Sequence, residues 1–377
     1  MNILWKVGVL SMRVASVRLR TLLPALSLAR SGFKVTVSDR SENEDALHNI
    51  DALIINKSFR DEDIGLARAA RQRGIPVVYD LCDYVYALDY GDGSGREGGQ
   101  VTDMLQHCSA FVTTGPALGE AIVAASGFDG QVYYIPDSEE PKSDVETLTA
   151  YWIEPGASTA VAGLTFSSAA LLTPEKHIFP KSDLRLAADA IFKRDGWLRP
   201  DRKTVFWFGT PGKAGSNTGL YALRMVKDAV EKVGRDIPLQ MLVVSSSRKL
   251  FRDYSRDYAV PCVFRPWTLM SMYDHFARAD VTVIPNPKDS FSIVKSANRA
   301  IFSLSCETPV IADPVPSLDE FAGCTQQDGW ERGLRAYLSD PQKAASDVAE
   351  AKRIIAGSYS LNAIRDRWIE ALETVAK

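Results

Sequence analysis

Short apolar runs rich in β-branched residues alternate with amphipathic stretches along the first third of the chain. The runs predict β-strands at 3–10, 34–38, 52–56, 76–80, 110–113 and 132–135. The stretches between them carry apolar residues at helical spacing and predict helices at 16–31, 61–73, 98–107 and 116–126. Apolar strands separated by single helices form a parallel sheet that is covered on both faces. We therefore predict an N-terminal Rossmann-like α/β domain over residues 1–141.

This alternation stops at residue 142 and restarts at residue 203. We interpret residues 142–202, which mix Pro, Ser, Thr and Gly with apolar pieces, as an irregular interdomain insertion with one helix at 183–193. Strands are then predicted at 204–208, 240–245, 262–264, 281–284 and 308–312, and helices at 219–233, 248–258, 270–279 and 294–306. These elements predict a second Rossmann-like domain over residues 203–358. The amphipathic tail 359–377 predicts a closing helix, expected to pack back towards the N-terminal domain.

Length and composition agree with a two-domain, water-soluble protein. The chain has 377 residues, which exceeds the usual size of a single hydrophobic core. A net charge of −3 argues against a general nucleic-acid binder. No apolar run is long enough to span a bilayer, and Lys6 interrupts the opening strand, so a signal peptide is not expected. The five scattered cysteines without a Cys-x-x-Cys pair are typical of reduced thiols in the cytoplasm, and the four histidines lack metal-ligand spacing.

The first 40 residues are unusually basic. They contain seven cations and one acidic residue, Asp39, the cations being Lys6, Arg13, Arg18, Arg20, Arg30, Lys34 and Arg40. Such a segment could face phosphates, an anionic acceptor or the negatively charged inner surface of a membrane. A solvated basic surface without a partner is the commoner use of such a cluster.

A polar segment at the start of the predicted helix 294–306 indicates an anion site. Lys295, Ser296, Asn298 and Arg299 are expected in its first turn, directly after a buried strand and a loop. There the unpaired backbone N–H groups and the helix dipole favour a phosphate, and ligands of open α/β sheets bind at this edge. The segment therefore predicts a nucleotide-diphosphate site. An ordinary polar helix start remains the alternative.

The usual nucleotide-binding loops are missing. The turn after the first strand, Gly8 to Arg13, lacks the Gly-x-Gly-x-x-Gly spacing of dinucleotide-binding proteins. The segment Gly209-Thr-Pro-Gly-Lys-Ala-Gly-Ser216 is similar to a P-loop but has only two residues before its Gly-Lys pair, where four are required. A nucleotide would therefore have to bind without either loop.

The two-domain layout, the closing helix and the motif Lys295-Ser-x-Asn-Arg299, followed by residues 303–317, resemble the GT-B fold glycosyltransferases. The likeness is to the large retaining family called group 1 or family 4, in its bacterial Lys-Ser-x-Asn-Arg branch. That family usually places two glutamates eight positions apart here, and this chain has instead Ser290 or Ser292 in the loop and Asn298-Arg299 on the helix. The chemistry of the two side chains, and not the family pattern, indicates that Asn298 could bond ribose hydroxyls and that Arg299 could pair with a phosphate.

The resemblance also implies roles at other strand ends. Gly209 through Gly212, with Lys213, would approach the diphosphate, and Ser245 to Ser247 with Arg248 would line the same edge. Arg265-Pro-Trp267 would lie near the base. Each of these has an alternative interpretation as a simple turn or as part of the core.

In the N-terminal domain, Ser16, Arg18 and Arg20 correspond to the acceptor-facing edge. Asp80 and Asp83 end another strand, where they would contact sugar hydroxyls or act as a base. Helix capping is the alternative for both aspartates.

Together these observations predict a cytoplasmic, metal-independent glycosyltransferase without a separate cofactor. It would move a sugar from a nucleotide diphosphate to a glycan or lipid-linked acceptor, in bacterial surface polysaccharide synthesis and with retained anomeric configuration. Preorganised donors, namely the helix start with Lys295 and Arg299 and the 209–213 loop, would meet the charge on the leaving diphosphate. Peripheral contact with the inner membrane surface is compatible with the basic segment. A nucleotide-sugar epimerase and a non-catalytic nucleotide-sugar-binding or assembly protein are the alternatives.

Overall fold

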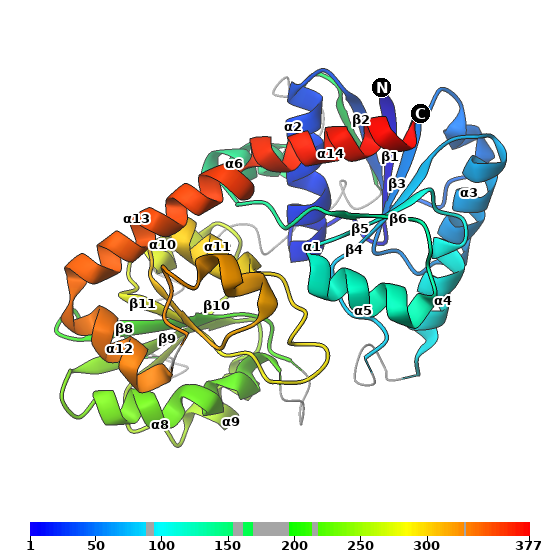
Figure 1. Ribbon diagram of the computed structural model, residues 1–377. Helices are drawn as coiled ribbons and strands as arrows, with labels where there is room; N and C mark the ends of the chain where they lie inside the picture. The colour runs from blue at the N-terminus through cyan, green and yellow to red at the C-terminus, as the bar shows by residue number, and fades with distance from the viewer. Residues whose placement is uncertain (88–93, 154–160, 169–195, 213–217, 328) are drawn as a thin grey trace. The chain divides into compact units, whose positions relative to one another are not determined.

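The computed structural model describes residues 1–87, 94–153, 161–168, 196–212, 218–327 and 329–377 (Figure 1). The chain divides into two compact units. The first contains residues 1–175, 294–298 and 356–377, and the second contains residues 176–293 and 299–355. None of the described helices has both the length and the apolar character needed to cross a bilayer.

The first unit is built on a seven-stranded parallel sheet with the order β6-β5-β4-β3-β1-β2-β7. Its strands are β1 (Asn2–Val7), β2 (Lys34–Ser38), β3 (Ala52–Asn56), β4 (Val77–Leu81), β5 (Ala110–Thr113), β6 (Gln131–Tyr134) and β7 (Leu164–Ser167). In the register of the central strand, Ile3 of β1 lies between Val35 of β2 and Ala52 of β3. The chain reverses its direction of growth between β1 and β3, which makes that position the topological switch point of the sheet.

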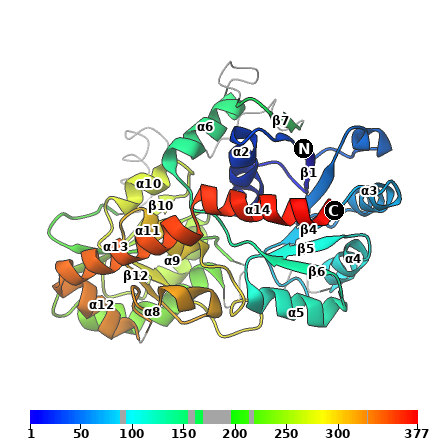
Figure 2. The same cartoon turned by 45° about the horizontal axis from the view of Figure 1, so that its top comes forward.

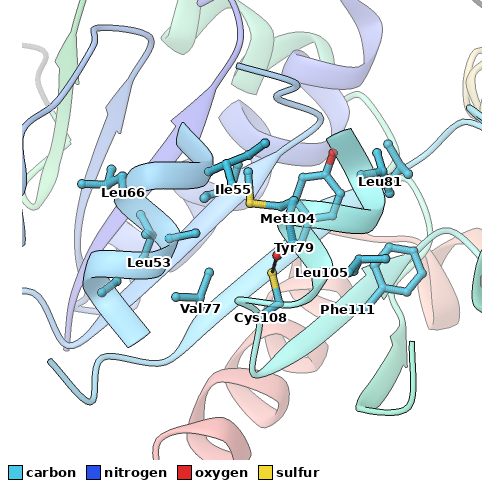
Figure 3. Close-up of a cluster of buried hydrophobic side chains, with 14 of the residues drawn as sticks. Leu53, Ile55, Leu66, Val77, Tyr79, Leu81, Met104, Leu105, Cys108 and Phe111 are labelled. Atoms are coloured by element: carbon cyan, nitrogen blue, oxygen red, sulfur yellow. Dashed lines mark hydrogen bonds between the residues drawn. The ribbon is translucent and has the colours of Figure 1, made fainter. Parts of the chain in front are cut away.

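Helices cover both faces of this sheet. They are α1 (Ala15–Val17), the π-helical turn η1 (Arg18–Leu22), α2 (Leu23–Arg30), the short η2 (Glu44–Leu47), α3 (Asp61–Gln72), α4 (Arg96–Leu105), α5 (Pro116–Ser126), α6 (Lys142–Ile153) and α14 (Leu361–Val375). On one face, side chains of β3 and β4 pack with α3 and α4, as Leu53, Tyr79, Leu66 and Met104 do in Figure 3. On the other face α14 runs beside α2, as both ribbon views show (Figure 2).

The second unit contains a five-stranded parallel sheet with the order β10-β9-β8-β11-β12. Its elements are β8 (Lys203–Phe208), η4 (Gly219–Ala222), α8 (Leu223–Val233), β9 (Leu239–Ser245), α9 (Arg248–Ser255), β10 (Cys262–Pro266), α10 (Ser271–Phe276), β11 (Val281–Ile284), α11 (Asn298–Ser305), β12 (Val310–Ala312), η5 (Pro316–Phe321), α12 (Trp330–Ser339) and α13 (Pro341–Ser358). Here the switch point lies between β8 and β11, because β9 and β10 were added on one side and β11 and β12 on the other.

Strand β8 shows why both faces of the second sheet are covered. Its successive side chains point to opposite faces, yet all of them are apolar from Val205 to Phe208. Val205 and Trp207 pack with α8, α9 and α12, whereas Phe206 and Phe208 pack with α10 and α11. A strand of this kind needs an apolar layer on each side, and the five helices supply the two layers.

The predicted fold class is confirmed: two parallel sheets with helices on both faces make up the chain. Most strands lie within one or two residues of their predicted positions. The expectation of an irregular segment at 142–202 was wrong in two places, because α6 begins at Lys142 and β7 adds a parallel edge strand beside β2. The predicted helix 183–193 lies outside the described residues.

The predicted helix 294–306 begins later than expected, at Asn298. Residues 294–297 form turns and extended backbone instead, and they belong to the first unit together with Asn298. Val294 packs against the apolar cluster of that unit, which explains why this short stretch does not join the helix of the second unit.

A tryptophan pair links α14 to the sheet of the first unit. The rings of Trp5 on β1 and Trp368 on α14 meet edge to face with centroids 4.9 Å apart. Each side chain is at most 1% exposed, so the pair is part of the core. An edge-to-face contact between buried aromatic rings adds to the energy of area burial.

We expect Trp368→Ala to lower the free energy of unfolding of the first unit by about 3–5 kcal/mol, because it leaves a large cavity beside β1. Urea denaturation followed by circular dichroism measures the change. Trp197→Ala is the matched control, since Trp197 is 55% exposed. A transition shifted no more by Trp368→Ala than by the control would contradict the assignment of α14 to this core.

Candidate functional site

Arg299 occupies the first turn of α11 in the second unit. Its Nη2 donates a hydrogen bond of 3.1 Å to Oδ1 of Asn286. No carboxylate lies within ion-pair distance of its guanidinium among the residues that the structure describes. Burial lowers the pKa of Arg299 to about 10, so the charged form lacks the stabilisation that water or a carboxylate would provide. The arrangement favours the arrival of an anion.

Two residues missed by the sequence analysis hold Arg299 in place. Asn286, only 6% exposed, follows β11, and its backbone N donates a 3.0 Å hydrogen bond to Oδ2 of Asp313, which follows β12. Burial raises the pKa of Asp313, and the bond from Asn286 partly offsets this effect. The chain Asp313–Asn286–Arg299 therefore lies at the carboxyl edge of the sheet, with Asn286 beside the switch point. Asn286 and Asp313 could have been identified from the sequence, because each is a polar residue shortly after a buried strand.

Ser292 forms its described hydrogen bonds within its own loop. Its Oγ donates a 3.1 Å hydrogen bond to Oδ2 of Asp289, and its backbone N donates one of 2.6 Å to Oδ1 of the same residue. The side chain is 1% exposed. The serine therefore closes the turn of its own loop, and its contact with a nucleotide stays a prediction.

Ser245 and Arg265 likewise hold the sheet edge together. Ser245 is fully buried, and its Oγ donates a 2.9 Å hydrogen bond to the carbonyl oxygen of Gly209. Nη1 of Arg265 donates to the carbonyl oxygens of Gly196 and Phe264, at 3.2 and 2.8 Å. The described contacts of both residues stabilise strand ends, and their direct contact with a nucleotide stays a prediction.

The glycines after β8 allow two backbone segments to cross closely. Gly212 has a φ of 72°, and a Cβ there would lie 2.4 Å from the carbonyl oxygen of Thr218. Gly219, which the sequence analysis missed, has a φ of 68° and approaches Gly212 equally closely. A side chain at either position would separate these segments. Gly209 is beside the ring of Trp207, and Lys213 lies outside the described residues.

Much of the basic N-terminal segment is buried and neutralised in the first unit. Lys6 is 3.7 Å from Asp63, and Arg18 pairs with Glu140. Burial is the largest influence on Lys6 and lowers its pKa. The prediction that Lys6, Arg18 and Arg20 belong to a basic surface was therefore wrong. Arg13, Lys34 and Arg40 are exposed, as is Arg30, which pairs with Asp144 at 2.5 Å.

Asp80 and Arg20 form a buried ion pair below the carboxyl edge of the first sheet. Nε of Arg20 donates a 3.2 Å hydrogen bond to Oδ2 of Asp80, and Nη2 donates to the other oxygen. Asn56 donates to Asp80 at 2.7 Å, and Arg20 also lies 3.6 Å from Asp137. Burial by itself would lower the pKa of Arg20, but the carboxylates of Asp80 and Asp137 raise it above its ordinary value. Asp80 is 0% exposed and its carboxylate is paired with Arg20, so its contact with a sugar stays a prediction.

Ser296 belongs to the same polar network. Its Oγ donates a 2.5 Å hydrogen bond to Oδ2 of Asp137. Ser296 and Lys295 both belong to the first unit, and both precede the start of α11 at Asn298. The expectation that Lys295 and Ser296 lie in the first helical turn was wrong, and Asn298 and Arg299 alone of the four motif residues occupy it.

Asp83 is accessible, unlike Asp80. It follows β4 and forms an ion pair with Lys57, which follows β3 and was not predicted. The side chain of Lys57 is 24% exposed and that of Asp83 is 23% exposed. Burial raises the pKa of Cys82 between the two aspartates, so its thiol stays neutral. The pair therefore presents an accessible cation and carboxylate at the carboxyl edge of the first sheet.

The candidate site residues form two groups with different chemistry, one in each unit. The second unit has an arginine without a carboxylate partner at a helix start, and the first unit has an accessible, electrically neutral lysine–aspartate pair. Among the described residues, no three His, Cys, Asp or Glu side chains gather closely enough to hold a metal ion.

No known family model matches the sequence, and no curated protein is detectably similar to it. Solved structures are similar in fold along almost the whole chain. Sucrose-phosphate synthase from Thermosynechococcus elongatus has a TM-score of 0.62 at 14% identity, covering 100% of this chain and 99% of that one. Anabaena HepE in complex with UDP has a TM-score of 0.63 at 12% identity, with 99% and 100% covered. A Rickettsia africae glycosyltransferase has a TM-score of 0.61 at 10% identity, with 100% and 98% covered.

At these identities the likeness establishes the fold. The chain has the GT-B architecture of two Rossmann-like units, as the resemblance implied.

The burial of Asp80 leads to a stability prediction. We expect Asp80→Asn to lower the free energy of unfolding by about 3–5 kcal/mol, because it leaves the guanidinium of Arg20 buried without its main partner. Asp83→Asn, which breaks an accessible pair, should cost about 1 kcal/mol or less. Parallel urea titrations of both variants measure the two changes, and equal losses would refute the distinction between the aspartates.

Proposed function

We propose that this protein is a glycosyltransferase that uses a nucleotide-diphosphate sugar, and that the second unit binds the diphosphate. The arginine without a carboxylate partner in the first turn of α11 carries the proposal. Arg299 is partly buried and has no carboxylate partner among the described residues. A cation in this position is unfavourable, and a bound anion would relieve that unfavourable state. Arg299 is also held in one orientation by Asn286, so little conformational freedom would be lost on binding.

A diphosphate suits this position better than a simple carboxylate. Backbone N–H groups at the start of α11 and a planar guanidinium together offer several donors for the oxygens of a phosphate. The close glycine crossing after β8 lies at the same sheet edge, where backbone N–H groups can approach a ligand. HepE, which has a similar fold, was solved with UDP, so UDP is the first probe of choice.

The proposed reaction breaks the bond between the sugar and the diphosphate. Positive charge then develops on the sugar ring and negative charge on the leaving diphosphate. Arg299 and the N–H groups of α11 would stabilise that negative charge as preorganised donors. Lys295, shortly before the helix, would add a further cation. We propose that no metal ion and no separate cofactor are needed for this step, and that the anomeric configuration is retained as in the family that the motif resembles.

We further propose that the acceptor is a glycan or a lipid-linked sugar in bacterial surface polysaccharide synthesis, and that the enzyme acts in the cytoplasm. The exposed cations Arg13, Lys34 and Arg40 would support peripheral contact with an anionic inner membrane surface.

A second function has one observation in its favour. The first turn of α11 carries Asn298 and Arg299 and no carboxylate. The absence of the glutamates that the resembled family has there favours a protein that binds a nucleotide sugar without transferring it. Incubation with labelled nucleotide sugars separates these functions. Release of the nucleoside diphosphate supports transfer, conversion to another nucleotide sugar supports an epimerase, and binding with an unchanged donor supports the binding protein.

Arg299→Ala should weaken the binding of UDP at least tenfold, which corresponds to about 1.4 kcal/mol, because it removes the cation that meets the phosphates. Isothermal titration with UDP, performed in EDTA, measures this loss and also tests whether UDP binding needs a metal ion. The control is Arg256→Ala, since Arg256 is paired only with the exposed Asp257 among the described residues. Equal UDP affinities for wild type and Arg299→Ala would exclude the phosphate assignment.

Asn286→Asp provides a sharper test of charge. The new carboxylate would pair with Arg299 and compete with the phosphates, so we expect a loss of UDP affinity at least as large as in Arg299→Ala. Asn286→Ala removes the hydrogen bond without adding charge and should cost less. The same titration compares the variants, and the proposal fails if Asn286→Asp binds UDP as tightly as Asn286→Ala.

A further inference from the structure

The switch point of the first sheet carries a second candidate site. It lies between β1 and β3, where Gly8 and Lys57 follow the two strands. A Cβ placed on Gly8 would lie 3.7 Å from the carbonyl oxygen of Lys57, so the two strand ends are in contact. In open parallel sheets, ligands bind outside the carboxyl ends of the strands at this point.

Lys57 has an unfavourable backbone conformation. Its φ of 43° falls in the left-handed region, which residues other than glycine rarely adopt. Its backbone N donates a 2.9 Å hydrogen bond to the carbonyl oxygen of Asp80, which fixes the turn. Glycine would fit this conformation without strain. A partly exposed ion pair contributes little to stability, so the pair with Asp83 does not by itself offset this backbone strain.

The lysine positions a carboxylate. Nζ of Lys57 donates a hydrogen bond to Oδ2 of Asp83, and the thiol of Cys82 lies 3.9 Å from the same oxygen. The other oxygen, Oδ1, has no partner among the described residues, and 23% of the side chain is exposed. Asp83 therefore keeps one accessible acceptor whose direction is set by the bond to Lys57.

The charge of the pair indicates the class of ligand. Arg299 has no carboxylate partner among the described residues and favours an anion, whereas Lys57 is already neutralised by Asp83. An anion would have to displace the carboxylate, whereas a hydroxyl group can donate to Oδ1 without disturbing the pair. Sugars offer such hydroxyl groups.

We propose that Asp83 binds a sugar hydroxyl through Oδ1 and that Lys57 is the positioning residue that orients its carboxylate. This inference rests on the proposed glycosyl transfer, which supplies the two sources of such a hydroxyl, the donor sugar and the acceptor sugar. The shared chemistry is a hydroxyl donating to a fixed carboxylate oxygen.

Four variants test the pair: Asp83→Asn, Lys57→Ala, Lys57→Gly and Lys57→Arg. One titration adds methyl α-D-glucopyranoside to protein saturated with UDP and represents an acceptor sugar. A second compares the affinities of UDP-glucose and UDP and isolates the donor sugar. Urea denaturation of each variant reports folding.

We expect Asp83→Asn and Lys57→Ala to weaken one of the two sugar interactions at least fivefold. Lys57→Gly should show the same loss while its unfolding midpoint is unchanged or higher, because it relieves the backbone strain. Lys57→Arg should retain most of the affinity. Loss confined to the glucoside assigns the pair to the acceptor, and loss confined to UDP-glucose assigns it to the donor.

Binding of UDP itself should be unchanged in all four variants, and this result separates the inference from the proposed function. A failure of wild type to bind UDP would refute the diphosphate site, and the glucoside titration repeated without UDP would then test the pair by itself. The pair proposal is overturned if wild type binds neither sugar probe, or if Asp83→Asn and Lys57→Gly bind both as wild type does.

Discussion

The buried guanidinium of Arg20 constrains the whole carboxyl edge of the first sheet. A cation without access to water must find its partners inside the protein, and Arg20 finds them on separate elements: Asp80 at the end of β4, and the carbonyl of Ile135 and Asp137 after β6. Asn56 on β3 and Ser296 complete the same network. The strand ends must keep their relative positions, because a shift of any of them would leave a buried charge unpaired. The end of β4 is thereby held in place, and Asp83, which follows this strand, reaches solvent from a fixed position.

The second unit uses an arginine in the opposite way. Arg299 is held by a neutral amide and lacks a carboxylate among the described residues, so its charge is available to the anion that we propose to bind there. The two arginines thus illustrate how burial and partners divide one residue type between structure and binding. The Lys57–Asp83 pair is intermediate, since it is neutral as a pair yet accessible.

Much of the fold could be predicted from the pattern of apolar residues, because each parallel strand is buried on both faces and reads as a continuous apolar run. Strands β3 and β11 were predicted at their observed limits. The elements that were missed depend on distant contacts: β7 is a short strand at the sheet edge, formed by its pairing with β2. The candidate site was predicted less well. Asn298 and Arg299 were placed correctly in the helix start, but the sequence did not show that Ser245, Ser292 and Asp80 bond to partners within the protein.

The sequence by itself determined two α/β units, the position of their strands and the presence of a cationic segment before β12, because periodicity and composition are local properties. Only the tertiary structure decided which charged residues are available. Arg20 and Asp80 are 60 residues apart in the chain, and Arg299 and Asn286 are 13 apart. Such partners meet through the crossovers of a parallel sheet, and no local pattern records the meeting. Burial and pairing, which separate a structural ion pair from a binding group, therefore appear only once the chain is folded.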